Sequence, residues 1–397
     1  MPVTAATKLQ FFWRDPYVSK EFRTGVSLHS HTMYSEESLD MVPRYTRKLP
    51  YLGAAIRRQQ VEYNSRKDCE FDFSNAFWTP PFAPRQAYRI EESQIQRLFQ
   101  LPALVSITDH DDIRAGIRLR VLERFRSAPI STEWTVPFGP TFFHVGIHNL
   151  PALEAGEIME RLSAFTANPQ EDKLCELLGL LNSYRDVLLV LNHPLWDEKG
   201  VGAANHAQTL ERLLARHGRD FHALELNGLR SWRENRDVLR IAQQSGLPLV
   251  GGGDRHGGEP NAIVNLSRAD NLADSIRDIR YSRRNHVVFM SAYHEPLKLR
   301  VLQMMVDVLR DYPENLEGRR HWTDRVFYRD PSRCEVLPIS SIWQDGGPRL
   351  VRQFVAGMRL LQSRTARSLL RIALEDRSKN SARYAFASLD VDREQAV

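Results

Sequence analysis

Short apolar segments alternate with amphipathic ones between residues 25 and 290 of this 397-residue chain, and few architectures accommodate that rhythm. The apolar segments read as strands and lie at 25–28, 104–108, 130–136, 142–147, 187–191, 223–226, 248–251 and 287–290. The amphipathic segments have helical periodicity and lie at 114–127, 151–166, 171–184, 208–217, 232–245 and 272–283. Strands that alternate with helices predict a parallel β/α architecture. Because these strands are apolar on both faces, they favour an α/β barrel.

The first expected strand ends in two histidines, His29 and His31, and Glu36 follows five residues later. Residues i and i+2 of a strand point to the same side, so both imidazoles can converge on one metal ion. Imidazole suits Zn, Mn and Fe, and added carboxylates favour Mn and Fe. We therefore predict a metal site at the end of this strand.

Later strand ends carry the same kinds of side chain. The strands of a β/α barrel end on one face, and the chemistry of such barrels takes place there. The candidate metal ligands at these ends are His29, His31, Glu36, His110, Glu133, His144, His193, Asp254 and His256. This set exceeds what one ion needs, so two or three divalent ions (Mn, Zn or Fe) are predicted. Ions about 4 Å apart clamp the attacking and leaving oxygens of a phosphoryl displacement.

Taken in order, these motifs resemble those of the PHP (polymerase and histidinol phosphatase) phosphoesterases. His-Ser-His-Thr-x-Tyr-Ser at 29–35 is similar to the first motif of that family, and Ile-Thr-Asp-His-Asp at 107–111 to the second. The later motifs of the family resemble Glu133, His144, Asn192-His193-Pro194 and Gly253-Asp254-Arg255-His256-Gly257. The resemblance covers roughly residues 25–290. It implies a distorted (β/α)7 TIM-like barrel with a trinuclear Mn, Zn or Fe cluster that hydrolyses phosphate esters.

The chain departs from the family pattern in two places. Glu36 stands where the family often has aspartate or histidine, and its longer side chain can still reach a third ion; the alternative is a solvent-facing or capping carboxylate before Ser38-Leu39. The interval from His31 to His110 is well beyond the usual spacing of the family, so the intervening segment is expected to reshape substrate access.

Two candidate catalytic residues flank the predicted ligands. Asp109 precedes His110, and it could be a ligand, a partner that fixes an imidazole tautomer, or a helix N-cap. His148 lies four residues after His144 and could hold phosphate or protonate a leaving group, whereas the structural alternative is a hydrogen-bonded loop histidine.

Candidate substrate-binding residues are Arg230 and Arg255, whose guanidinium groups can fork onto phosphate oxygens. Glu225 and Asn227 end a strand on the same face and would either touch the site or brace the barrel. Arginines are common in this chain, so a solvated role is the alternative for each of the two.

Two regions extend the barrel. Residues 41–100 are expected to form an insertion after strand 1, a lid or wall over the site, because this segment is rich in aromatic residues and proline.

Residues 1–295 would then be the barrel domain, and 296–397 a mostly helical C-terminal extension. That extension carries the net charge of +5, since from 297 onward 18 Lys+Arg face 13 Asp+Glu. Its basic amphipathic segment 349–374 could meet nucleic acid or anionic lipid, or pack on the barrel with a solvated face.

The function predicted from these residues is metal-dependent hydrolysis of a phosphate ester. A metal-bound hydroxide would attack phosphorus in line while ions and arginines neutralise the equatorial oxygens. Small phosphorylated molecules, such as nucleotides or sugar phosphates, are the first choice of substrate. Nuclease or phosphodiesterase activity on short oligonucleotides comes second. The remaining alternatives are a metal-dependent amidohydrolase and a catalytically inert PHP-like binding domain.

The sequence also predicts a cytoplasmic location. No signal peptide is expected at the start, and no run of about 18 apolar residues is present to span a membrane. Three widely separated cysteines make a disulfide framework unexpected and fit a reducing compartment. The sequence leaves the oligomeric state open.

Overall fold

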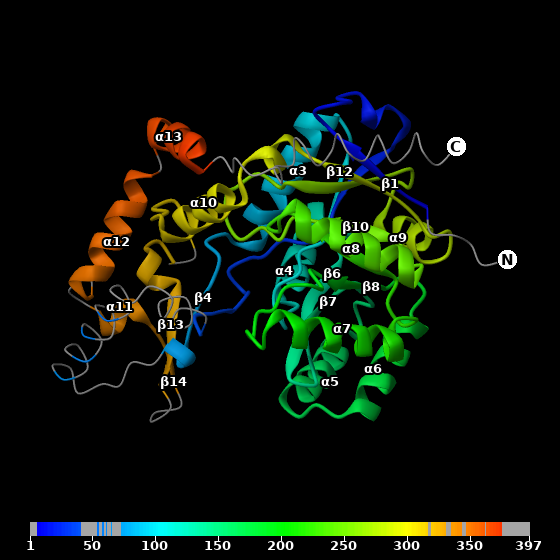
Figure 1. Cartoon of the computed structure of the whole chain (residues 1–397), viewed down its shortest axis with the longest axis horizontal. Coiled ribbons are helices and arrows are strands. Elements are labelled where there is room, and N and C mark those ends of the chain that lie inside the picture. The colour runs from blue at the N-terminus through cyan, green and yellow to red at the C-terminus, as the bar shows by residue number, and fades with distance from the viewer. Residues whose placement is uncertain are drawn as a thin grey trace.

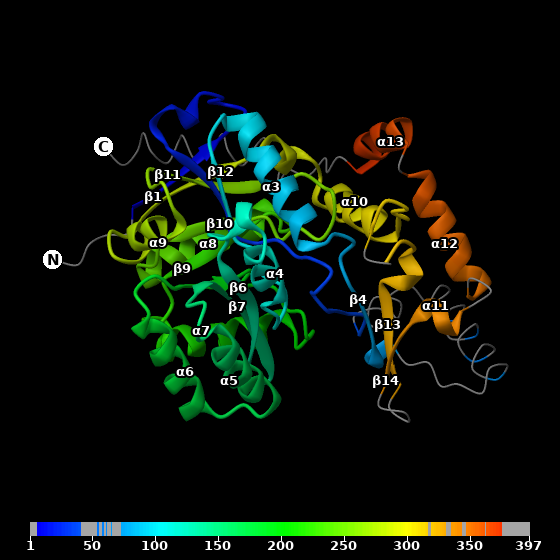
Figure 2. The same ribbon diagram turned by 180° about the vertical axis from the view of Figure 1, so that it is seen from behind.

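A computed structural model describes residues 6–40, 73–316, 319–330, 335–343, 347–361 and 363–374, together with 54, 58, 61 and 65. Two parts stand out in Figures 1 and 2. One part holds two five-stranded sheets with helices α3 to α9, and the other holds a four-stranded sheet with α10 to α13. The alternation of strands and helices that the sequence predicts is confirmed as a mixed α/β fold.

The first sheet contains two strands that the sequence did not reveal. Its order is β1 (Ala6–Phe11), β12 (Arg284–Phe289), β11 (Ile263–Ser267), β2 (Thr24–Ser27) and β5 (Ala103–Val105). β1 runs parallel to β12, and β2 runs parallel to β5. β11 runs antiparallel to both of its neighbours. Neither β1 nor β11 was expected.

The second sheet combines parallel and antiparallel pairs. Its order is β10 (Leu249–Gly252), β9 (Ala223–Asn227), β8 (Leu188–Asn192), β7 (Thr141–Leu150) and β6 (Ile130–Phe138). β10, β9 and β8 are parallel, whereas β7 is antiparallel to β8 and to β6. The Pro-Phe-Gly-Pro turn joins β6 and β7 into a hairpin, and a hairpin requires antiparallel strands.

Side-chain hydrogen bonds and one isolated backbone bridge, between Ser30 and Arg255, join the two sheets along one side. The amide of Asn285 donates to Leu249 O (2.9 Å), and that of Asn265 both accepts from Gly251 N (2.7 Å) and donates to Gly251 O (2.8 Å). On the other side, one isolated bridge connects His110 to Glu133. Within the described residues no continuous ladder joins the two sheets into one closed barrel, so the distorted (β/α)7 TIM-like barrel expected from the sequence is not confirmed.

Helices bury the outer faces of these sheets. They are α3 (Pro84–Phe99), α4 (Arg114–Arg120), α5 (Ala155–Ala167), α6 (Glu171–Ser183), α7 (Ala203–His217), α8 (Trp232–Ser245) and α9 (Leu272–Arg280). Short 3₁₀ turns lie at Val18–Glu21, Phe73–Asn75, Glu123–Phe125, Ser291–His294 and Trp322–Asp324. The leucines of α6, for example, pack into one buried cluster with those of β8, and such burial stabilises by about 1.5–3 kcal/mol per side chain.

The four-stranded sheet links distant parts of the chain. Its order is β14 (Glu335–Pro338), β13 (Val326–Asp330), β4 (Ala76–Trp78) and β3 (Glu37–Ser38), and every pair in it is antiparallel. The remaining helices are α10 (Leu297–Leu309), α11 (Ile339–Ile342), α12 (Arg349–Leu360) and α13 (Arg364–Leu374). The segment expected at 349–374 is thus two helices. Residues 41–72 of the predicted insertion, apart from four single positions, lie outside the described residues.

Among the described residues, no helix is both long and apolar enough to cross a membrane.

Candidate metal centre

The two histidines that follow β2 are fully buried and face each other. His29 Nε2 and His31 Nε2 are 3.0 Å apart, and each is 1–2 % exposed. His29 Nδ1 lies 2.6 Å from Glu225 Oε1. A hydrogen bond from Nδ1–H to this carboxylate leaves the Nε2 lone pair free to bind a cation. Glu225, for which the sequence left two roles open, thus orients His29.

Glu133, in the middle of β6, is the centre of the site. Its Oε2 lies 3.0 Å from His29 Nε2, 3.4 Å from His31 Nε2 and 3.4 Å from His110 Nδ1. Its Oε1 lies 3.1 Å from His193 Nε2 and 3.7 Å from His144 Nδ1, and it accepts from Asn192 Nδ2 (2.9 Å). One carboxylate therefore faces imidazoles on both sides, as a bridging ligand does.

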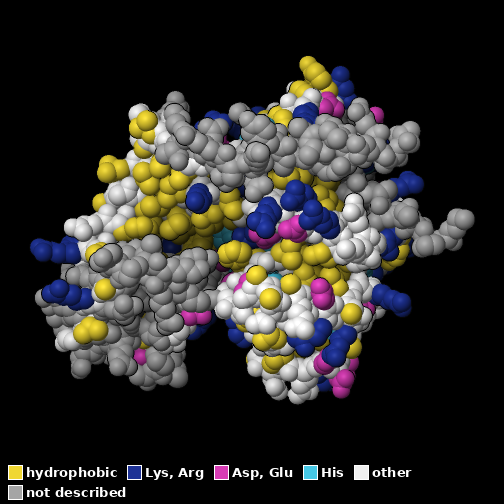
Figure 3. Space-filling view, viewed as in Figure 1, with side chains coloured by type: hydrophobic (Ala, Val, Ile, Leu, Met, Phe, Trp, Pro, Cys, Tyr) yellow, Lys and Arg dark blue, Asp and Glu magenta, His cyan; other side chains and the backbone are white. Residues whose placement is uncertain are grey.

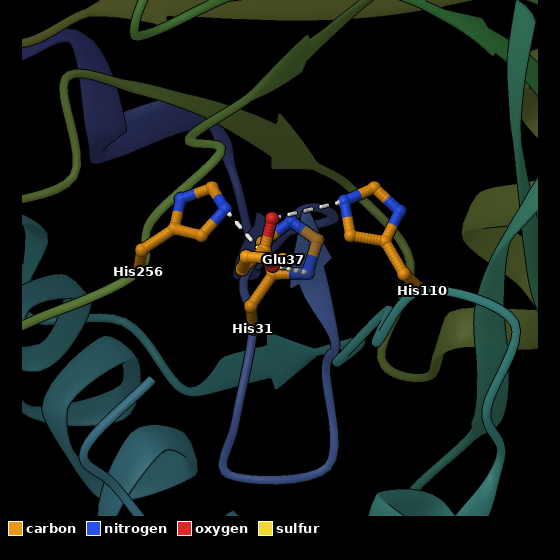
Figure 4. A group of neighbouring side chains, drawn as sticks. All are labelled: His31, Glu37, His110 and His256. Carbon is orange, nitrogen blue, oxygen red and sulfur yellow. Dashed lines mark ion pairs between the residues drawn. The ribbon is translucent and has the colours of Figure 1, made fainter. Parts of the chain in front are cut away.

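A second carboxylate, Glu37, lies between two further histidines (Figure 4). Its Oε2 is 3.4 Å from His110 Nε2 and its Oε1 is 3.3 Å from His256 Nε2, with His31 Nδ1 at 3.9 Å. The sequence assigned this role to Glu36. Glu36 lies one residue before β3 and instead pairs with Arg329.

Asp254 completes the set from the end of β10. Its Oδ1 lies 3.5 Å from His31 Nε2 and 3.7 Å from His29 Nε2. Its Oδ2 accepts from Asn227 Nδ2 (3.1 Å), and Asn227 also donates to Glu225 Oε2 (2.9 Å). Asn227 therefore braces two carboxylates of the site.

The donor atoms fit divalent cations. Three groups have their donor atoms within 4.8 Å of one another: His29, His31 and Glu133; His110, Glu133 and His144; and His31, Glu37, His110 and His256. Nitrogen and oxygen donors of this mixture suit Mn, Fe and Zn. Glu133, His31 and His110 each belong to two groups, so two or three neighbouring ions can share ligands. Eight of the nine predicted ligands meet here, and Glu37 takes the place of the ninth.

The pKa values of Glu133 and His256 indicate that the buried carboxylates of the site attract positive charge. Burial favours the neutral form of Glu133, but His29, His110 and His144 outweigh it and hold the pKa of this carboxyl well below its usual value. Burial likewise lowers the pKa of His256, yet Glu37 and Asp254 raise it to about 9. The carboxylates thus remain ionised and draw positive charge onto their neighbours, a role that divalent cations can fill.

The two candidate catalytic residues are not part of this cluster. Asp109 accepts hydrogen bonds from Thr32 N (2.5 Å) and Thr32 Oγ1 (2.7 Å), and burial raises its pKa to about 7. It fixes the loop after His31 instead of touching a donor atom. His148 Nδ1 lies 2.8 Å from Ser106 Oγ within the core, and burial lowers the pKa of His148 to about 3. Both side chains thus bind to groups of the protein itself in this structure.

The two candidate substrate-binding arginines differ from each other in burial and in their distance from the site. Arg255 is 2 % exposed and donates to Glu91 Oε1 (2.7 Å), Ala87 O (3.2 Å) and Gly257 O, so it anchors α3 and is closed to substrate. Arg230 lies at the rim of the site. Its Nη2 is 3.8 Å from Asp254 Oδ2, and its guanidinium carbon is 4.0 Å from the centre of the Trp196 ring.

A small cavity of about 10 Å³ opens beside the donors. It is lined by Phe142, Phe143, His144, Asn192, His193, Trp196 and Glu198. The sequence did not indicate Glu37, Trp196 or Glu198 as site residues. Glu198 and Trp196 follow the Asn192-His193-Pro194 motif within six residues, which is the only signal that could have pointed to them. Figure 3 shows histidine in a hollow between the two parts of the molecule.

Comparisons with known proteins give distant likenesses. No family model matches the chain, and no curated protein matches it. Sixteen chains of solved structures do match. One is PsfC from Pseudomonas syringae, at 16 % identity and a TM-score of 0.39, covering 55 % of this chain and 89 % of that one.

Two further solved structures are similar to this chain. A candidate metal-dependent phosphoesterase from Bifidobacterium adolescentis has 14 % identity and a TM-score of 0.33, over 66 % of this chain and 96 % of that one. An amidohydrolase from Chromobacterium violaceum, solved with sulfate and no metal, has 15 % identity and a TM-score of 0.30, over 45 % and 84 %.

Proposed function

We propose that this protein is a metal-dependent hydrolase that cleaves phosphate monoesters of small molecules. The observation that carries the proposal is the position of Glu133, whose two oxygens face separate sets of histidines at 3.0–3.7 Å. A carboxylate placed to share neighbouring cations suits hydrolysis of a phosphate ester by two or more ions. When bound, divalent ions acidify water and neutralise the charge of a phosphoryl group.

Glu225 fixes the positions of two candidate metal ligands. His29 is fixed by Glu225, and His193 N donates to the other oxygen of Glu225 (2.9 Å). This carboxylate therefore sets the positions of two donors at once. Outer partners of this kind hold ligands in place and raise metal affinity 10–100-fold.

Arg230 is the residue that would orient the substrate. Its planar guanidinium forms paired hydrogen bonds with phosphate oxygens readily, and stacking on Trp196 restricts its rotation. The side chain of Arg230 is 13 % exposed, so solvent can reach it, and its Nη2 lies 3.8 Å from the candidate ligand Asp254. The cavity beside His144 and His193, of about 10 Å³, has room for about one water molecule in this structure.

Metal analysis combined with a substrate panel tests the proposal. Purified full-length protein is expected to hold two or three Mn, Zn or Fe ions per chain. After loading with Mn, it should release phosphate from nucleotides or sugar phosphates. Glu133→Gln should lose both bound metal and activity, whereas Glu157→Gln, on the exposed face of α5, should retain both. Cleavage of short DNA or RNA without release of phosphate from mononucleotides would replace the monoester proposal with a nuclease.

A chain with fewer than about 1.5 ions and no activity on any phosphate ester would contradict the proposal and leave the inert binding domain as the explanation.

A further inference from the structure

A second cavity, of about 320 Å³, lies outside the metal centre. None of the nine donor residues lines it. Its wall is built from α3, the segment that follows β10, the 3₁₀ turn Ser291–His294 and α10. Its volume falls within the range of pockets that bind small molecules, about 300–1,000 Å³. Arg97, Pro260 and Ser291 are its exposed lining residues and mark its opening to solvent.

Three charged side chains in this wall have a buried atom without a hydrogen-bond partner among the described residues. These atoms are Glu259 Oε2, Glu295 Oε2 and Arg300 Nη1. Buried polar atoms are paired in the great majority of cases, so three in one cavity call for an explanation. Glu259 is 6 % exposed, which makes its unpaired oxygen costly unless a ligand or water occupies the cavity.

The same three side chains are otherwise held in place. Glu259 Oε1 accepts from His256 N (2.9 Å), and Glu295 Oε1 lies 3.5 Å from Arg371 Nη1. Arg300 donates from Nε to Glu295 O and from Nη2 to the backbone oxygen of Arg230, both at 3.2 Å. Each of these side chains is therefore fixed by some of its polar atoms, while one further polar atom has no hydrogen-bond partner in the described part of the chain. A bound ligand could supply that partner.

The rest of the wall is mainly apolar. Phe12, Leu98, Leu229, Pro260 and Met290 contribute carbon surface between the charged groups. A ligand that matches this wall has a cationic group for Glu259 and Glu295, an anionic group for Arg300, and an apolar body.

We propose that this cavity binds a small zwitterion with an apolar body, of the type represented by an apolar α-amino acid. Its carboxylate pairs with Arg300 and its ammonium with Glu259 and Glu295. This site does not depend on the proposed hydrolase activity, because it uses different residues and involves no metal.

Calorimetric titration of the full chain with L-leucine, L-methionine and L-phenylalanine tests the proposal. At least one of these probes is expected to bind. Its N-acetyl derivative, which lacks the ammonium, and its amide, which lacks the carboxylate, should each bind at least tenfold more weakly. Equal binding by a derivative, or no binding by any of the three probes, would overturn the assignment and leave a cavity filled by water.

Two substitutions locate the binding. Ala292→Leu fills the cavity without removing a charged group and should abolish binding of the probe. Glu295→Gln keeps the shape of the side chain and should weaken binding about tenfold, whereas Glu157→Gln on α5 should leave it unchanged. Thermal melting of each variant verifies that it is folded. A folded Ala292→Leu protein that binds the probe as tightly as the parent would refute this location.

Discussion

At the scale of single residues, the neighbouring glutamates Glu36 and Glu37 have opposite surroundings. Glu37 lies within 3.3–3.4 Å of two imidazole nitrogens, whereas Glu36 forms an exposed pair with Arg329. Exposed ion pairs contribute only about 0–1 kcal/mol, so Glu36 is dispensable for stability. The two positions form a matched pair for experiment.

We expect Glu37→Gln to lose one bound ion per chain and most hydrolytic activity, because the amide cannot replace a carboxylate ligand between His110 and His256. Glu36→Gln should keep the full metal content and activity. Elemental analysis of both proteins, purified side by side, checks this. Equal metal content in the two variants would show that Glu37 is not a ligand.

Arg230 allows a second prediction at this scale. Its loss should remove charge-assisted hydrogen bonds to the substrate, each worth about 1.5–3 kcal/mol, so Arg230→Ala should raise KM roughly tenfold or more. Metal content should stay unchanged. Arg233→Ala, at an exposed position of α8, is the control. Steady-state kinetics on the best phosphomonoester make the comparison, and an unaltered KM in Arg230→Ala would exclude this residue from substrate binding.

The single-residue errors of sequence interpretation have a common physical cause. The strand that begins at Glu37 has only two residues, so the sequence gives no alternating pattern from which to choose between Glu36 and Glu37 as the ligand. Arg255 carries a charge that suits phosphate, but its burial against Glu91 depends on α3, which is remote in the sequence. Local sequence identifies the kind of side chain, and tertiary packing decides its direction.

At the scale of elements, the candidate metal ligand Glu37 depends on a strand from the C-terminal part of the chain. β3 pairs with β4, and β4 pairs with β13, so residues 326–330 support the segment that carries Glu37. β13 is an interior strand of this sheet, and interior strands tolerate proline poorly because each residue donates to the ladder.

Phe327→Pro should therefore loosen β3 and cost at least one bound ion, with the two five-stranded sheets still folded. Val336→Pro, in the edge strand β14, should have a smaller effect. Metal analysis and circular dichroism of both variants check the expectation. Full metal content in a Phe327→Pro protein would mean that β3 holds Glu37 without help from β13.

Elements with strong end signals were predictable. The helix expected at 232–245 is observed as Trp232–Ser245, since Ser231 caps its start through Glu234 N and Gly246 ends it at a φ of 67°. β11 escaped notice because Asn265 interrupts a short apolar run, and β1 because its residues alternate weakly in polarity. The role of Asn265 in joining two sheets is visible only once both sheets are present.

At the scale of the whole molecule, the candidate donors come from both five-stranded sheets or the segments that follow their strands, and from β3, so ions bound at the proposed centre would link three sheets. Ligands that bind only the folded state stabilise it, by about 2.7 kcal/mol at one hundred times the Kd. Chelation with EDTA should accordingly lower the melting temperature, and stoichiometric Mn or Zn should restore it. Glu133→Gln should show no such response. A melting temperature of the parent that EDTA leaves unchanged would contradict a structural contribution of the ions.

Stability should also fall in acid because of a histidine outside the metal centre. His222 accepts at Nδ1 from Leu189 N (2.9 Å) and lies 2.7 Å from Asn182 Oδ1, and burial, with Arg280 nearby, lowers its pKa to about 3. The unfolded histidine has a pKa of about 6.5. Below pH 6.5 the unfolded chain therefore binds a proton that folded His222 does not. The contribution of His222 to the free energy of unfolding is fully present above pH 6.5. It is lost between pH 6.5 and 3, by up to about 1.4 kcal/mol per pH unit.

Urea denaturation at pH 7.5 and pH 5 measures this contribution. His222→Gln should be less stable than the parent at pH 7.5, and the difference should shrink at pH 5. His321→Gln, whose side chain is 68 % exposed, should follow the parent at both values. A constant difference between His222→Gln and the parent would show that His222 does not titrate on unfolding.

The antiparallel strand β11 bears on when, during synthesis, the candidate metal centre can form. β2, which delivers His29 and His31, is held on one side by a strand made more than two hundred residues later. During synthesis the first two histidines therefore emerge long before the framework that fixes them. We therefore expect the proposed loading with ions to follow the synthesis of Ser267, and ribosome stalling upstream of β11 should prevent it.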